Sequence, residues 1–120
     1  MKENIIRDKS YKFSLRIVKL YRYLIENKKE YILSKQVLRS GTSIGANVEE
    51  AIGGHSDRDF ISKLTVAYKE ARETRYWLNL LIDSGYLELK LTESLLDDCE
   101  EICRIIGSIQ KTCKDKIRNL

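Results

Sequence analysis

The chain has 120 residues, no proline, six glycines and a net charge of +4, which suits one helical domain over residues 1–120. No alternating β-branched run predicts a strand. Three cysteines in the last quarter and a single histidine argue against a disulfide framework and against a zinc site. We find no signal peptide and no apolar run of transmembrane length, so we expect a cytoplasmic protein with no membrane partner. No motif in the chain indicates a cofactor, and we expect none.

The first helix is predicted from Ser10, or already from Asn4, to Asn27. At 100° per residue its apolar side chains fill an arc of roughly 160°, whereas one helix of a simple bundle needs about 100°. The surplus predicts a second buried surface, and therefore self-association. The residues of this arc are Phe13, Ile17, Val18, Leu20, Tyr21, Leu24 and Ile25.

A basic sector occupies the other side of this helix, within about 80° on the same wheel. Its members are Lys9, Lys12, Arg16, Lys19 and Tyr23. It is either an ordinary solvated face or a footprint for phosphates. The net charge is +7 over residues 1–39, −7 over 40–103 and +4 over 104–120. Because the first and last helix termini of an up-down bundle share a pole, we expect the sector to lie near Lys111, Lys114, Lys116 and Arg118.

The second helix follows a connector over residues 28–33, with Ser34 as its predicted N-cap. One seam is apolar and contains Val37, Gly41, Ile44, Val48 and Ala51. A parallel polar seam should be partly buried and therefore needs partners; it contains Gln36, Ser40, Ser43, Asn47 and Glu50. The GxxxG spacing of Gly41 and Gly45 predicts that a neighbouring helix approaches the backbone closely here. A phosphate loop is the weaker alternative, because the sequence has neither a GKS or GKT motif nor a preceding strand. Gly53-Gly54 is predicted to end the helix in the left-handed conformation.

The third helix is predicted over Asp57–Ser84, with Ser56 and Asp59 at its start and Gly85 after its end. Glu70 and Glu73 are the expected partners of Arg39, Ser43 and Asn47, in a hydrogen-bond network between helices or subunits. The core seam of this helix contains Phe60, Leu64, Ala67, Ala71, Thr74, Leu78 and Leu81.

Catalytic and metal chemistry finds little support in the residue pattern. A magnesium site of Glu50, Glu70 and Glu73 is the alternative to the network, but no helix carries the Glu-x-x-His pair of di-iron bundles. His55 lies in a predicted turn with no ligand set around it and no nucleophile paired to it. We therefore expect neither a metal site nor an enzyme.

The fourth helix follows a turn over Tyr86–Leu91, with Thr92 as the predicted cap. Acidic residues are expected in its first turns and basic residues in its last, which matches the helix dipole and gives part of the charge asymmetry a purely structural explanation. Those acidic residues are Asp97, Asp98, Glu100 and Glu101. The core seam is Leu95, Cys99, Ile102, Ile106, Ile109, Cys113 and Ile117.

Two sequence blocks resemble a known family. The first is Gln36-Val37-Leu38-Arg39-Ser40 with Thr42 to Ala51; the second is Asp59 to Leu64 with Ala67, Lys69-Glu70-Ala71, Glu73-Thr74 and Tyr76-Trp77-Leu78. They resemble the small proteins encoded within intervening sequences of bacterial large-subunit ribosomal RNA genes. The resemblance implies an all-α, antiparallel up-down-up-down four-helix bundle that assembles as a ring, a homopentamer in known relatives. Some relatives are accessory subunits of diversity-generating retroelements and contact the reverse transcriptase and its RNA.

Two functions remain open. One is a non-catalytic oligomeric scaffold that binds the backbone of RNA or DNA, with steep salt dependence and little sequence preference. The other is a protein-interaction or assembly module, for example an accessory subunit for a reverse transcriptase, whose charges keep it soluble.

Overall fold

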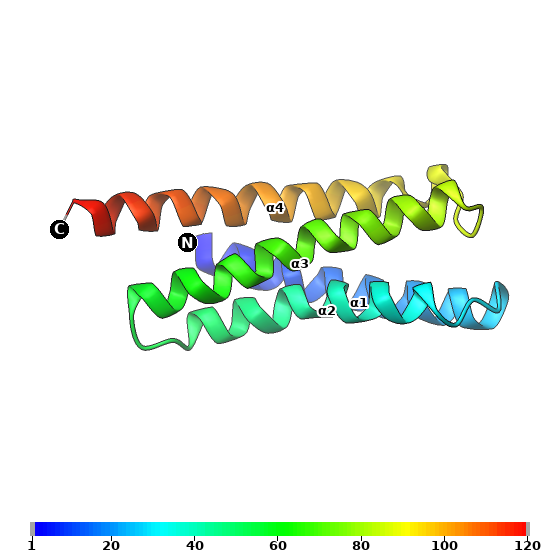
Figure 1. The fold of residues 1–120 in the computed structure, drawn as a ribbon, viewed down its shortest axis with the longest axis horizontal. Coiled ribbons are helices and arrows are strands. Elements are labelled where there is room, and N and C mark those ends of the chain that lie inside the picture. Colours follow the sequence, from blue (N-terminus) through cyan, green and yellow to red (C-terminus); the bar gives the residue numbers. More distant parts are fainter. Residues whose placement is uncertain (1, 120) are drawn as a thin grey trace.

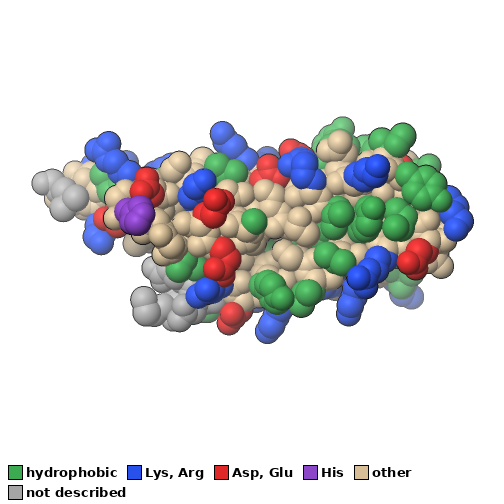
Figure 2. Space-filling view, turned by 90° about the horizontal axis from the view of Figure 1, so that it is seen from below, with side chains coloured by type: hydrophobic (Ala, Val, Ile, Leu, Met, Phe, Trp, Pro, Cys, Tyr) green, Lys and Arg blue, Asp and Glu red, His purple; other side chains and the backbone are tan. Residues whose placement is uncertain are grey.

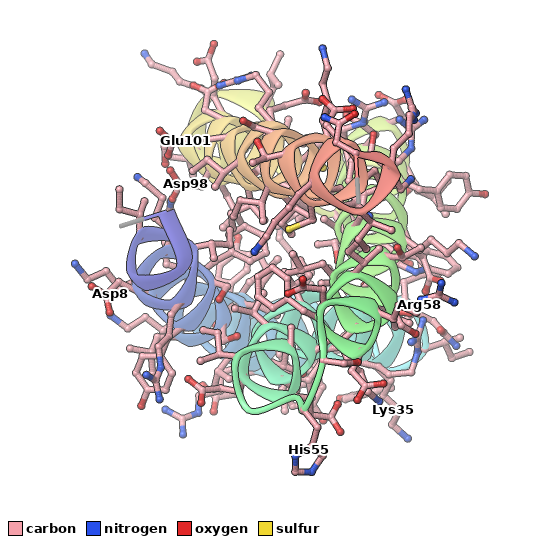
Figure 3. All side chains as sticks on the ribbon, turned by 90° about the vertical axis from the view of Figure 1, so that its left-hand side faces the viewer. Asp8, Lys35, His55, Arg58, Asp98 and Glu101 are labelled. Atoms are coloured by element: carbon pink, nitrogen blue, oxygen red, sulfur yellow. The ribbon has the colours of Figure 1, made fainter. Side chains whose placement is uncertain are left out.

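Four helices make up the protein: α1 (Lys2–Asn27), α2 (Leu33–Ile52), α3 (Asp57–Asp83) and α4 (Leu89–Arg118). They are seen in a computed structural model that describes residues 2–119, and the side chains of residues 5–119. The helices run alternately up and down, in a body of 53 × 22 × 21 Å (Figure 1). Viewed end-on they occupy the corners of a square, in which α1 and α3 each contact α2 and α4 (Figure 3). The predicted four-helix bundle is confirmed, and no strand occurs in residues 2–119.

The core is an apolar column between the four helices, formed by the predicted seams. In α2, Val37, Ile44 and Val48 are fully buried. The α3 seam is buried from Leu64 to Leu81, and the α4 seam from Leu95 to Ile109. Burial of these seams is the main stabilising term, because each large apolar side chain contributes about 1.5–3 kcal/mol when it is removed from water.

Gly41 and Gly45 bring α2 close to α1. A Cβ atom on Gly41 would lie only 2.7 Å from Cγ1 of the fully buried Ile17, and one on Gly45 would lie 3.2 Å from Oγ of Ser14. The predicted close approach is therefore confirmed, and the helix that approaches is α1.

The start of α2 differs from the prediction. The helix begins at Leu33, and the side chain of Ser34 lies inside the first turn, fully buried, instead of capping it. The cap comes from the buried Glu30, whose carboxylate accepts the backbone N–H of Ile32 at 3.1 Å and of Ser34 at 2.7 Å. A carboxylate suits this place because helix N-termini carry unpaired donors and a positive dipole end.

The other helix ends agree only in part with the predictions. Ser56 caps α3 by accepting the N–H of Asp59, and Gly85 ends that helix with φ +90°, both as predicted. Gly53 has φ −82°, so the predicted left-handed end of α2 is wrong. Thr92 does not cap α4 either, because that helix already begins at Leu89 and the Thr92 hydroxyl donates to the Glu88 carbonyl.

Candidate nucleic-acid interface

The basic sector of α1 faces α4 along one edge of the bundle. Lys9 donates a hydrogen bond to Glu101 at 2.8 Å. Arg16 binds Asp98 at 2.5 Å and the Ser94 hydroxyl at 2.7 Å. Figure 3 shows both acidic side chains on the side of α4 nearest α1. These carboxylates were predicted in the first turns of α4; because the helix starts at Leu89, they lie further along it and neutralise two members of the sector.

The Lys9–Glu101 pair shifts both titrations. The hydrogen bond from Lys9 lowers the pKa of the Glu101 carboxyl, and the same bond raises the pKa of the Lys9 ammonium. The charged form of each group is thus favoured by the other. Lys12 and Lys19 of the same sector are exposed, as is Tyr23.

The second basic group lies elsewhere on the molecule. Lys111, Lys114 and Arg118 are exposed on the last turns of α4, and Lys116 lies 3.8 Å from Asp57 at the start of α3. Since Lys9 pairs with Glu101, Lys111 lies ten residues further along α4, about 15 Å at 1.5 Å per residue. The two groups therefore follow one another along the bundle and do not overlap, although the start of α1 and the end of α4 lie at the same end of it, as predicted (Figure 1).

Arg39, which lies beside the polar seam of α2, connects this helix to α3. Its guanidinium binds Glu70 at 3.0 Å and also pairs with Glu73, as predicted. Trp77 adds a hydrogen bond from its indole N–H to Glu73 at 3.0 Å. This half-exposed network links α2 to α3 at one register.

Ser43 and Asn47 do not contact the partners predicted for them, whereas Ser40 and Glu50 do meet residues of α3. Asn47 donates to Oγ of Ser43 at 3.0 Å within α2, and among the described side chains neither residue forms a hydrogen bond with Glu70 or Glu73. Ser40 is fully buried and lies 2.9 Å from the Thr74 hydroxyl of α3. Glu50 lies 3.7 Å from Lys63 on the surface. Gln36 is half-buried.

A third concentration of positive charge was not predicted from the sequence. Arg72 and Arg75 of α3 and Arg104 of α4 line one groove between these helices. Two of the three fall within residues 40–103, where the net charge of −7 concealed them. The signal available in the sequence was their spacing, since residues three apart share one helix face.

The described residues form no metal site, and His55 lies apart from the bundle. Among side chains 5–119, no group of three or more His, Cys, Asp or Glu residues is placed to hold a metal ion. His55 is exposed in the α2–α3 turn and points away from the bundle (Figure 3). None of the helices described in residues 2–119 is long and apolar enough to cross a lipid bilayer.

The fold and sequence together define the class of protein. Residues 2–108 match the family described as 23S rRNA-intervening sequence protein, and the chain belongs to that family. A crystal structure of a protein of unknown function from the S23 ribosomal protein family of Bacteroides thetaiotaomicron is similar to it, with 51% identity and a TM-score of 0.91. The match covers 92% of this chain and 99% of that one. No curated protein matches the chain.

Proposed function

We propose that this protein is a cytoplasmic, non-catalytic oligomeric scaffold that binds nucleic acid, RNA in particular, through backbone phosphates and with little sequence preference. The observation that carries the proposal is the set of exposed cations that form no salt bridge with a described carboxylate. Within the two basic groups of α1 and α4 described above, these are Lys12, Lys19, Lys111, Lys114 and Arg118. Cations of this kind contact phosphates, which carry no base information.

Assembly into a ring, a homopentamer as the family resemblance implies, would repeat these cations around one axis. Weak contacts from each subunit would then combine through multivalency. The half-buried Val18, Tyr21 and Ile25 of α1 support self-association, because a single bundle leaves this part of the wide apolar arc incompletely covered.

The test is a fluorescence titration of single-stranded RNA and of DNA at about 50 mM and about 200 mM salt. We expect micromolar or tighter binding at the lower salt and a steep loss at the higher salt. Lys12→Glu with Lys19→Glu should weaken binding more than Arg58→Glu with Lys90→Glu, which changes the charge equally elsewhere. Absence of RNA and DNA binding by the wild-type protein at low salt would refute the proposal.

An assembly module that contacts another protein, for example a reverse transcriptase, is the second candidate. It is favoured by exposed apolar side chains at the end of the bundle with the α1–α2 and α3–α4 connections. There, Ile32 is 74% exposed and Leu91 75% exposed. Figure 2 shows hydrophobic side chains gathered toward this end on the face seen there. Light scattering measures the size of the protein in solution and so tests self-association. A monomer at micromolar concentration would contradict the proposed ring.

A further inference from the structure

A groove of about 500 Å³ lies between α3 and α4, the two helices that run side by side in Figures 1 and 3. Arg72 and Arg75 line it from α3, and Cys103, Arg104 and Gly107 line it from α4. The helices position these groups well, because residues three or four apart on a helix share one face.

The groove carries a surplus of positive charge. Arg75 is paired with Glu100, which also lines the groove. Arg72 and Arg104 are exposed, and neither forms a salt bridge with a carboxylate among side chains 5–119. Three arginines against one glutamate leave a net charge of +2 in a concave surface, where the potential is focused. Guanidinium groups suit phosphate in particular, because their planar fork can bind two of its oxygens at once.

Gly107 keeps the floor of the groove open. It lies in the interior of α4, where glycine is less favourable than alanine. Close packing does not require it, since a Cβ atom built there meets nothing within 4 Å, in contrast to Gly41 beside Ile17. The missing side chain instead leaves free space on the helix face that Gly107 shares with Cys103 and Arg104, four and three residues earlier in the chain.

The ligand that fits this chemistry is a phosphate of a flexible nucleic acid strand. Tyr68 is half-buried at the same groove and offers a ring against which an unstacked base can lie. We propose that the α3–α4 groove holds a backbone phosphate of single-stranded RNA between Arg72 and Arg104. This inference rests on the proposed nucleic-acid function and adds a defined phosphate site to the exposed cations named there.

The first experiment removes the two unpaired arginines. We expect Arg72→Ala with Arg104→Ala to weaken binding of a labelled single-stranded oligoribonucleotide by about tenfold or more, as loss of charge-assisted hydrogen bonds to phosphate would. The slope of log K against log salt should become shallower by about 1. The matched control is Arg58→Ala with Lys90→Ala, both exposed and each fourteen residues before its counterpart, about 21 Å along the same helix. The control should bind within about twofold of the wild type; equal binding by the two double variants would overturn the inference.

A second pair of variants leaves every charge in place. Gly107→Leu should fill the groove and weaken RNA binding by about tenfold, whereas Gly107→Ala should bind nearly as well as the wild type. Both should fold at least as stably as the wild type, because the site is open and glycine is a poor helix former. Wild-type affinity in a folded Gly107→Leu variant would contradict the inference.

The Cys103 thiol reports occupancy of the groove directly. Contact with the Cys99 thiol lowers the pKa of Cys103, and the charges of Arg75 and Arg72 lower it further. Alkylation by iodoacetamide, followed by peptide mass spectrometry, should slow several-fold at Cys103 when RNA is bound. The variant Arg72→Ala with Arg104→Ala is the reference, and RNA should not slow the alkylation of Cys103 in it. An equal effect of RNA on Cys103 in the wild type and in this variant would contradict the inference.

The alkylation experiment is repeated with other ligands in place of RNA: single-stranded DNA, inorganic phosphate and a nucleoside monophosphate, each added separately. Protection of Cys103 by RNA at a concentration where inorganic phosphate and the monophosphate give none supports a polymer backbone as the source of the phosphate. Protection by the monophosphate at that concentration would replace RNA with a free nucleotide. Wild-type protein that binds no RNA refutes the proposed function itself, whereas RNA binding that is independent of Arg72, Arg104 and Gly107 refutes only this site.

Discussion

The Glu30 carboxylate accepts the backbone N–H of Ser34 at 2.7 Å, so that a loop residue caps a helix that begins three positions later. Glu30 is only 8% exposed, and the same carboxylate also receives the N–H of Ile32. The connection between α1 and α2 is thereby fixed at the point where the chain reverses.

Replacing Glu30 with alanine should lower the free energy of unfolding by about 1–2 kcal/mol, because two backbone donors lose their acceptor. Ser34→Ala is the control and should be neutral or stabilising. The Ser34 hydroxyl is fully buried and has no hydrogen-bond partner among the described residues. Urea unfolding followed by circular dichroism measures both, and a larger loss for Ser34→Ala than for Glu30→Ala would contradict this view of the cap.

Two glycine-to-alanine substitutions should have opposite signs. Gly41→Ala forces a methyl group against the buried Ile17, and we expect a net loss of about 1–2 kcal/mol despite the better helix propensity of alanine. The methyl group of Gly107→Ala meets open space, so this substitution should raise the free energy of unfolding by about 0.5–1 kcal/mol. Thermal and urea unfolding of the two variants side by side gives the comparison. If both changes stabilise the protein, α1 is not packed on α2 at Gly41.

A buried pair of hydroxyls joins α2 to α3. The Thr74 hydroxyl lies 2.9 Å from Oγ of Ser40 and 2.7 Å from the Glu70 carbonyl. Thr74 has one hydroxyl proton, so when it donates to the carbonyl, Ser40 must donate to Thr74. A double-mutant cycle of Ser40→Ala and Thr74→Val should give a coupling free energy of about 0.5–1.5 kcal/mol. Strictly additive effects would show that the two side chains do not interact in solution.

The Lys9–Glu101 pair should make stability depend on pH at both extremes. Glu101 has a lowered pKa in the folded protein, so its contribution is present above the ordinary value of 4.5 and is lost as the pH falls through the folded value. Lys9 has a raised pKa, so its contribution is present below the ordinary value of 10.5 and is lost as the pH rises through the folded value.

We therefore expect the urea midpoints of wild type and Glu101→Gln to differ by a small, constant amount between about pH 6 and about pH 9. The difference should shrink as the pH falls through the lowered pKa of the folded Glu101 carboxyl, because both proteins then carry a neutral group at this position. High salt should reduce it, since the pair is partly exposed. A difference that grows as the pH falls would contradict the assignment.

The periodicity of apolar residues predicted most of the fold, because burial repeats with the helix period and depends little on the rest of the chain. The Leu64 to Leu81 seam of α3 follows from spacing alone. The Arg39 contacts with Glu70 and Glu73 follow from spacing together with the antiparallel pairing of α2 and α3. The cap of α2 could not be predicted this way, since it depends on how the chain folds back at Glu30.

The candidate interface was predicted less well, because it depends on which helix faces each charge. A helical wheel groups Lys9 and Arg16, but it does not show that Glu101 and Asp98 of a different helix lie opposite them. The arginine groove was missed for the same reason, since Arg72 and Arg104 meet only when α3 and α4 pack.

The ion pairs between neighbouring helices also match only one of the two possible windings of the bundle. Arg7 lies on the flank of α1 that faces Glu49 of α2, whereas Lys9 lies on the opposite flank, against Glu101 of α4. A bundle of the same four helices wound in the opposite sense would exchange these flanks and separate each cation from its carboxylate. The ion pairs therefore favour this winding over its mirror image, in addition to the close packing of α2 on α1 at Gly41.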